Sequence, residues 1–149
     1  MNTSDPANSS ATLSAEVRLR LVVAGHDPVP LTASLYYYAD DPFAIRMAFD
    51  VCTDEPVEWI FARDLLAAGL QERAGEGDVR ISPGNRIDRD VLNIVLTSPS
   101  GHAHFEAPLN ATAAFLQRTF AVIAAGHETD TIDLDRQIRE LIWPELPAQ

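Results

Sequence analysis

The segment from Asp54 to Leu70, DEPVEWIFARDLLAAGL, changes its hydrophobic period halfway along its length. In the first half, apolar residues recur at every second position and share one face of a strand: Val57, Trp59 and Phe61. After the charged pair Arg63–Asp64, leucines recur at helical spacing: Leu65, Leu66 and Leu70. A half-buried strand that leads straight into a short helix is a supersecondary unit, and this one holds no catalytic set. The segment therefore predicts a structural scaffold and does not indicate a chemical reaction.

Similar alternation predicts further strands before this unit. They cover Val17–Val23, Leu31–Tyr37 and Ile45–Val51, and polar turns separate them at Gly25–Pro28 and Asp40–Pro42. Each strand carries apolar residues on one face and more polar residues on the other. Consecutive strands joined by short polar turns are typical of an antiparallel meander.

The pattern returns in a second group of strands after the short helix. Val79–Ile81 marks a strand, Pro83–Asn85 a turn, and Val91–Thr97 a strongly apolar strand. The hairpin loop Ser98–Gly101 leads to a returning strand whose small and aromatic residues face one way: Ala103, Phe105 and Ala107. No sequence repeat is evident, although the order of elements suggests two related halves.

The C-terminal part predicts a long helix and a closing helix. The long helix follows Pro108, with Asn110 as its N-cap. Its apolar positions fall at helical spacing: Phe115, Leu116, Thr119, Phe120 and Ile123. Asp133 caps the closing helix, and Pro144 ends it. The predicted fold class is therefore α+β, an antiparallel β-sheet or partial barrel with one short helix and two C-terminal helices.

The length of 149 residues suffices for one domain with a sizeable core. We expect a flexible tail over residues 1–15, which are rich in Ser, Thr, Asn and Ala, and a single domain over residues 16–149. No apolar stretch approaches the length of a bilayer span, so direct membrane insertion is not expected. The N-terminus lacks a signal-peptide pattern, and the single Cys52 fits a reducing compartment. The sequence thus predicts a soluble, cytoplasmic protein.

The charge balance bears on the class of partner. Acidic residues outnumber basic ones by 22 to 11, which gives a net charge of −11 and an isoelectric point near 4.6. Binding of nucleic acid phosphates or anionic lipid requires basic residues, so the overall charge argues against both. One basic cluster stands out, at Arg80, Arg86 and Arg89. It is either a solvated hairpin edge, where charges discourage aggregation, or a functional patch.

Catalytic and metal-binding patterns are sparse. No G-x-S-x-G elbow, P-loop or G-x-G-x-x-G motif occurs, and paired carboxylates fall in turns or at helix starts, where they bind free backbone amides. His102 and His104 share one face of a strand with Glu106, but their spacing matches no established zinc set and is typical of a wet strand face. We therefore expect no enzyme, no metal and no cofactor. A metal-dependent enzyme around these residues stays a remote alternative.

Some strands are apolar on both faces. Tyr36 and Tyr38 lie on the opposite face of their strand from Leu35, and Leu92 and Ile94 lie opposite the valines of theirs. Such a strand is buried between two layers or against another subunit. Helices of the same chain are one possible cover, and a second subunit is the other. The second alternative predicts an oligomer interface formed by Tyr36, Tyr38, Leu92 and Ile94.

The Asp54–Leu70 string, followed by GDVRI at Gly77–Ile81, resembles the core motif of the SsgA-like family of actinobacterial sporulation and cell-division proteins. Further segments match the family's other strands and C-terminal helices in the same order: Ala39–Val51, Leu96–Pro108 and Phe115–Trp143. The resemblance runs from about Glu16 to Trp143, most of the chain. One departure is the charged stretch Gly84–Asp90, GNRIDRD, where the family pattern has a more neutral loop.

The resemblance implies a Whirly-like fold and a non-enzymatic adaptor in sporulation-specific septation. Members of the family promote septum-site localisation and recruit the tubulin-like division protein FtsZ. The expected partners are thus FtsZ and other SsgA-like proteins, the expected assembly is a homotrimer, and the expected location is the division septum. An alternative follows from the Whirly proteins, which bind single-stranded DNA: Tyr36, Tyr38 and Trp59 would then stack on bases.

Overall fold

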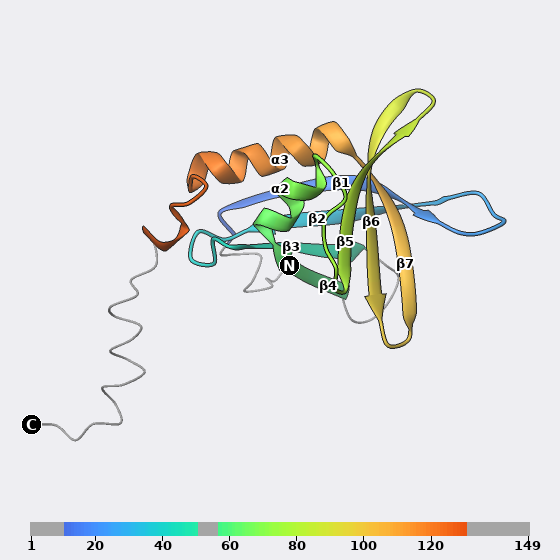
Figure 1. Ribbon diagram of the computed structural model, residues 1–149, viewed down its shortest axis with the longest axis horizontal. Helices are drawn as coiled ribbons and strands as arrows, with labels where there is room; N and C mark the ends of the chain where they lie inside the picture. Colours follow the sequence, from blue (N-terminus) through green and yellow to red (C-terminus); the bar gives the residue numbers. More distant parts are fainter. Residues whose placement is uncertain (1–10, 51–56, 131–149) are drawn as a thin grey trace, which may run out of the picture.

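The computed structural model describes residues 11–50 and 57–130. In these residues, seven strands form one antiparallel sheet in the order β4-β3-β2-β1-β7-β6-β5. Their bounds are β1 Leu13–Val22, β2 Val29–Tyr37, β3 Ala44–Asp50, β4 Val57–Ala62, β5 Val79–Arg86, β6 Arg89–Ser98 and β7 Gly101–Pro108. The sheet curls into a half-barrel with helices on its inner side (Figure 1). The predicted α+β class with an antiparallel sheet or partial barrel is confirmed, and the likeness to the Whirly fold stays a prediction.

Strands β1 to β4 form the predicted meander. Each pairs antiparallel with the next, so that Ala33 lies opposite both Val17 and Phe49 in neighbouring strands. Alternate residues are buried on the inner side, as period-two geometry requires. β1 begins at Leu13, ahead of the expected boundary at Glu16, because Leu13 and Ala15 continue the alternation and pair with β2. The last residues of the tail expected over 1–15 therefore belong to a strand.

Strands β5, β6 and β7 form a second antiparallel group, and β7 returns to pair with β1. In that pairing, Arg20 lies opposite Glu106, and Leu21 lies opposite Phe105. The two strands are far apart in sequence, so no local pattern predicts their contact. The β1–β7 pairing joins both groups of strands in one sheet around one core.

The turn expected at Pro83–Asn85 is wrong. These residues belong to β5 and pair one by one with β6, while the chain reverses at Ile87 and Asp88. Proline is tolerated here because β5 is an edge strand of the sheet. The charged stretch Gly84–Asp90 is therefore the end of a hairpin rather than an open loop.

Among the described residues, the helical elements are α2 (Arg63–Gly69), α3 (Leu109–Val122) and the short 3-10 turn η1 (Glu128–Asp130). α2 is the predicted short helix, and it follows β4 directly. Gly69 lets α2 lie close to β5, because a Cβ atom at this position would be 2.4 Å from Cγ2 of Ile81. None of the described helices is long and apolar enough to cross a bilayer.

α3 is the predicted long helix, but Asn110 is not its N-cap. Pro108 holds the capping position with no side-chain cap, and Asn110 lies within the helix. Proline is tolerated here because its φ of −67° is the value that its ring imposes, and a residue at this position donates no helical hydrogen bond. The predicted inner residues include the buried Phe115, Leu116, Thr119 and Ile123. The closing helix predicted from Asp133 lies outside the described residues.

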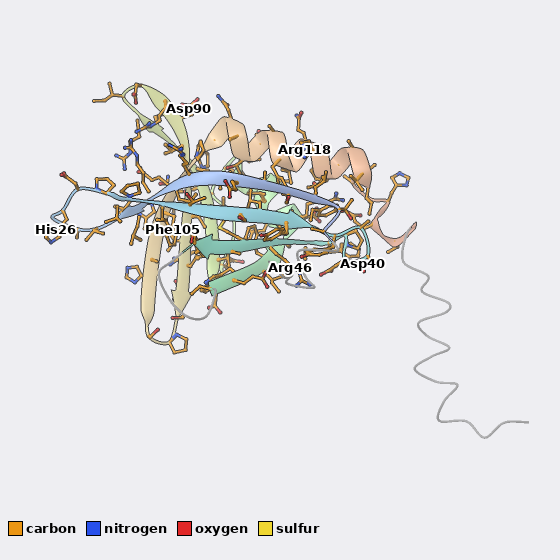
Figure 2. The ribbon with its side chains drawn as sticks, turned by 180° about the vertical axis from the view of Figure 1, so that it is seen from behind. His26, Asp40, Arg46, Asp90, Phe105 and Arg118 are labelled. Atoms are coloured by element: carbon orange, nitrogen blue, oxygen red, sulfur yellow. The ribbon has the colours of Figure 1, made fainter. Side chains whose placement is uncertain are left out.

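The core lies between the inner face of the sheet and the helices. α3 packs against β1, β6 and β7, and α2 packs against β4 and β5. The rings of Phe49 and Phe105 stack with their centroids 4.8 Å apart. The other members include the fully buried Leu19, Leu35, Ile45, Leu66, Ile81, Leu92 and Ile94. The described helices leave the outer face of the sheet open (Figure 2).

Candidate interaction surfaces

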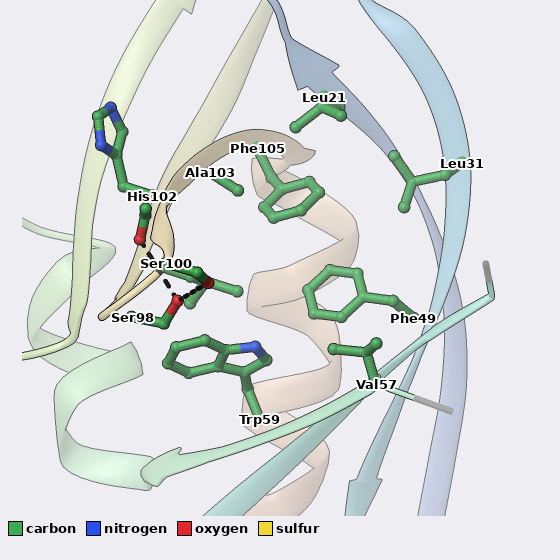
Figure 3. Close-up of a pocket in the computed structure, with 12 residues that line it drawn as sticks. Leu21, Leu31, Phe49, Val57, Trp59, Ser98, Ser100, His102, Ala103 and Phe105 are labelled. Atoms are coloured by element: carbon green, nitrogen blue, oxygen red, sulfur yellow. Dashed lines mark hydrogen bonds between the residues drawn. The ribbon is translucent and has the colours of Figure 1, made fainter. Parts of the chain in front are cut away.

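An apolar groove of about 360 Å³ opens at one end of the half-barrel, between β4 and the β6–β7 hairpin. Figure 3 shows Trp59 and Val57 on the β4 side, with Phe49 and Phe105 further in and Ser98 near the hairpin. The remaining lining residues are Leu21, Leu31, Leu96, Ser100, Gly101, His102 and Ala103. Strand alternation places these side chains here, because the groove continues the inner face of the sheet beyond the helices.

The chemistry of this groove is that of a contact surface. Ser98 and Ser100 at its rim hydrogen-bond each other at 3.0 Å, and His102 is the one titratable side chain among its described lining residues. Acid–base or nucleophilic catalysis requires a second group within reach of the first. The groove therefore suits an apolar side chain better than a reacting substrate.

On the outer face, several arginines gather where β1, β7 and the β5–β6 hairpin meet: Arg18, Arg20, Arg86 and Arg89. We call this set the arginine face. Arg18, Arg20 and Arg89 line a cleft of about 60 Å³ together with Glu106. Glu106 is only 4% exposed, and Arg86 binds its carboxylate. Arg18 and Arg20 are exposed and have no ion-pair partner among the described residues.

The predicted basic cluster is only partly brought together. Arg86 and Arg89 lie opposite each other in the hairpin, whereas Arg80 lies further along β5. Sequence reasoning missed Arg18 and Arg20, because only the β1–β7 pairing brings them beside the hairpin. The one sequence signal was the alternation of both arginines with Val17 and Leu19, which indicates that the arginine side chains point outward.

The tip of the β5–β6 hairpin carries Ile87, whose side chain is fully exposed. The hairpin extends beyond the body of the sheet beside the start of α3 (Figure 1). A groove of about 510 Å³ lies between this tip and α3, with Pro108 and Leu109 on the helix side. Arg89 and Pro108 line both this groove and the cleft of the arginine face, so the two hollows are neighbours. Figure 2 shows this region from behind, with Asp90 marking the hairpin.

The three residues considered for a metal have other roles. His104 Nε2 lies 2.8 Å from Oδ1 of Asn93, and Glu106 is bound by Arg86. Burial lowers the pKa of His104, and the nearby Arg86 lowers it further, so the neutral ring donates to Asn93. His102 is exposed at the rim of the apolar groove. Within the described part of the chain, no group of three His, Cys, Asp or Glu residues is arranged to hold a metal ion.

The predicted interface residues do not form one surface. Leu92 and Ile94 are fully buried in the core beneath the chain's own helices, which corrects their expected place. They belong to the interior of one subunit and offer no surface to another. Tyr38 is also buried, with the Arg46 guanidinium 4.9 Å from its ring centre. Tyr36 is half-buried on the outer face, and its contact with a second subunit stays a prediction.

The residues considered for base stacking are likewise dispersed. Trp59 faces the apolar groove on the inner side, whereas Tyr36 lies on the outer side of the sheet and Tyr38 is buried. Stacking on single-stranded nucleic acid requires exposed rings along one positive groove. These three side chains form no such platform.

A buried arginine joins the helices and was missed by the sequence analysis. Arg63, the first residue of α2, is 0% exposed. Its Nη1 donates to the carbonyls of Thr119 at 3.1 Å and Ile123 at 2.7 Å, which end α3. Its Nη2 lies 2.7 Å from Oε2 of Glu128, and its guanidinium lies 4.1 Å from the ring centre of Phe120. A cation at this place satisfies the free carbonyls at a helix C-terminus.

Glu128 completes this junction from η1. The hydrogen bond from Arg63 holds the pKa of the Glu128 carboxyl below its ordinary value, so the ion pair is intact at neutral pH. The sequence shows Arg63 only as half of a charged pair at a helix start. Its partner follows much later in the chain, and no local spacing links the two.

The chain is similar to known proteins both in sequence and in fold. A family model described as "Streptomyces sporulation and cell division protein, SsgA" matches residues 31–128, well over half of the chain. The chain belongs to the SsgA family.

Several SsgA-family relatives extend the match to nearly the whole chain. The sporulation-specific cell division protein SsgB of Thermobifida fusca is 48% identical over 134 residues, which cover 90% of this chain and 97% of the relative. SsgB of Streptomyces coelicolor is 42% identical over 133 residues, which cover 89% and 97%. The family and these relatives support a role in cell division during sporulation.

Solved structures of SsgA-family proteins share the fold. The crystal structure of an SsgA-like sporulation-specific cell division protein from Thermobifida fusca YX-ER1 matches with a TM-score of 0.79 and 50% identity, covering 90% of this chain and 98% of that one. A structure reported with mutations in SsgB that correlate to longitudinal cell division in Streptomyces coelicolor matches with a TM-score of 0.78 and 43% identity, covering 83% and 98%. The curled antiparallel sheet with helices on its inner side is therefore the family's fold.

Proposed function

We propose that this protein is a non-enzymatic adaptor in sporulation-specific septation that promotes septum-site localisation and recruits FtsZ. The observation that carries the proposal is the 48% identity to a sporulation-specific cell division protein over 90% of this chain. FtsZ and other SsgA-like proteins are the partners we infer, and the cytoplasm at the division septum is the inferred location. Both inferences rest on the family resemblance.

The architecture supports an adaptor. A single sheet holds the core on its inner side and presents an open outer face, so contact groups can be arranged on a rigid support. Among the described residues, one hollow is lined mainly by apolar side chains, and the other two combine arginines with the carboxylates of Asp88, Asp90 and Glu106. In protein interfaces, a few aromatic, apolar or arginine anchors supply most of the binding energy.

Co-sedimentation with polymerised FtsZ from the same organism tests the proposal. The protein is expected in the pellet with the polymer and in the supernatant without it. The assay is repeated at low and physiological salt, because exposed charge contacts weaken as salt rises. It is also repeated with another SsgA-like protein added. Absence from the pellet under every condition would reject direct recruitment.

A further inference from the structure

We infer that the arginine face and the adjoining groove bind an acidic segment of a partner protein. The chain as a whole carries a net charge of −11 with only 11 basic residues, yet Arg18, Arg20, Arg86 and Arg89 lie together. A local positive patch on an acidic protein attracts and orients an oppositely charged partner. This inference goes beyond the proposed function, because it names the surface and the chemistry of what it binds.

The charges of Arg18 and Arg20 are available to a partner. Both side chains are exposed, and neither forms an ion pair within the described residues. Arg86 is already paired with the buried Glu106 and keeps this carboxylate in place. Arg89 and Asp88 lie 3.8 Å apart and form an exposed ion pair. Such a pair contributes little to stability, so Arg89 can bind a carboxylate of the partner instead. Free guanidinium groups bind carboxylates through paired hydrogen bonds.

The shape of the site suits an extended segment. The cleft between Arg18, Arg20 and Arg89 lies next to the larger groove beside the hairpin tip, and Arg89 and Pro108 line both. Ile87 on the hairpin and Leu109 on α3 give that groove an apolar side chain on each side. An acidic segment with one apolar residue would therefore place its carboxylates on the arginines and its apolar side chain against Ile87.

The same surface is a poor match for nucleic acid. β1, β5, β6 and β7 hold one Phe, Tyr or Trp side chain among them, Phe105, and it is buried against Phe49. The positive charge is also interrupted by Asp88 and Asp90 on the hairpin. Single-stranded nucleic acid is bound through a continuous positive groove with exposed stacking rings, and this face has neither. Asp88 and Asp90 would repel the carboxylates of an acidic peptide as well, so we place these carboxylates on Arg18 and Arg20 of β1 and the apolar residue on the hairpin side.

The test measures binding of a fluorescein-labelled synthetic peptide of alternating glutamate and serine with one central leucine. Fluorescence anisotropy at low salt compares the full-length protein with the Arg18→Gln/Arg20→Gln variant. The Arg73→Gln/Arg118→Gln variant is the matched control, because it removes the same charge from exposed arginines elsewhere. Arg86 is left intact, since its loss would leave Glu106 buried without its partner. Ile87→Ser tests the apolar end of the groove.

We expect measurable binding at low salt, because arginine clusters recognise acidic motifs. It should weaken at least about tenfold in the Arg18→Gln/Arg20→Gln variant, a few-fold in Ile87→Ser, and little in the control. A peptide with glutamine in place of glutamate should not bind. The inference is overturned if the protein does not bind the acidic peptide, if both double variants bind equally, or if a single-stranded oligonucleotide binds more tightly than the peptide. No arm of this assay contains FtsZ, so its result and that of the co-sedimentation are independent.

Discussion

One residue whose sequence pattern suggests an exposed position, Arg63, stabilises the packing on the inner side of the sheet. Arg63 looks like half of an exposed charged pair, yet it is fully buried and binds the end of α3 and Glu128. An arginine can occupy such a site because its planar guanidinium satisfies several acceptors while its face lies on aromatic rings. The rings here belong to Phe120 and Tyr37.

Replacing Arg63 by leucine should destabilise the protein by about 3 kcal/mol, because the change leaves a buried acceptor set without its donor. Urea unfolding followed by circular dichroism gives the free energy of unfolding. Arg73→Leu, at an exposed position, is the control and should change little. A loss no larger in Arg63→Leu than in the control would show that the junction contributes nothing to stability.

The pKa of Glu128 predicts a pH dependence. Its carboxyl has a pKa below the ordinary 4.5, chiefly because Arg63 hydrogen-bonds to it. A group whose pKa is lower in the folded chain stabilises folding above its unfolded pKa, and this contribution is lost as the pH falls through the folded pKa. Urea midpoints of the wild type should thus exceed those of Glu128→Gln at neutral pH and converge with them below pH 4.5. The exposed Glu72→Gln is the control and should match the wild type at neutral pH, and a constant gap for Glu128→Gln would contradict the assignment.

At the scale of elements, local patterns predicted most strands and both described helices, because alternation and helical spacing reflect burial directly. They failed where a contact between distant segments decided the outcome. Pro83–Asn85 reads as a turn but continues β5, since pairing with β6 extends the hairpin to Ile87. Local patterns could not predict the arginine face either, because β1 pairs with β7 only in the folded sheet.

The contact between α2 and β5 depends on Gly69. In Gly69→Ala the new Cβ would lie 2.4 Å from Cγ2 and 2.5 Å from Cβ of the fully buried Ile81, so the helix must move outward. We expect a loss of about 1–3 kcal/mol in the free energy of unfolding, typical of overpacking. Gly77→Ala is a matched control, because nothing lies within 4 Å of the place that its new Cβ would take. Equal midpoints for the two variants in urea would show that α2 does not need this close approach.

At the scale of the whole molecule, the outer face of the sheet is open in one chain, and exposed apolar side chains such as Phe43 and Ile60 lie near one edge. Cyclic symmetry would let each subunit bury the same patches against its neighbours. It would also hold several weak contacts together, which raises avidity for a polymer.

We expect a homotrimer, with Tyr36 of the outer face nearer to the interface than the buried Leu92 and Ile94. Light scattering coupled to size exclusion gives the mass directly, and the trimer should persist at micromolar concentration. Tyr36→Glu should shift the mass toward the monomer, whereas Arg118→Glu on α3 should leave it unchanged. A monomeric wild type at micromolar concentration would contradict the prediction.

Imaging in the native organism tests whether this protein is a division adaptor at sporulation septa. A fluorescently tagged copy, expressed from its own promoter beside tagged FtsZ, is followed through sporulation. We expect regularly spaced foci at future septa that coincide with FtsZ, and loss of regular FtsZ placement when the gene is deleted. A diffuse signal, or one that follows the nucleoid while FtsZ ladders form normally without the protein, would contradict it.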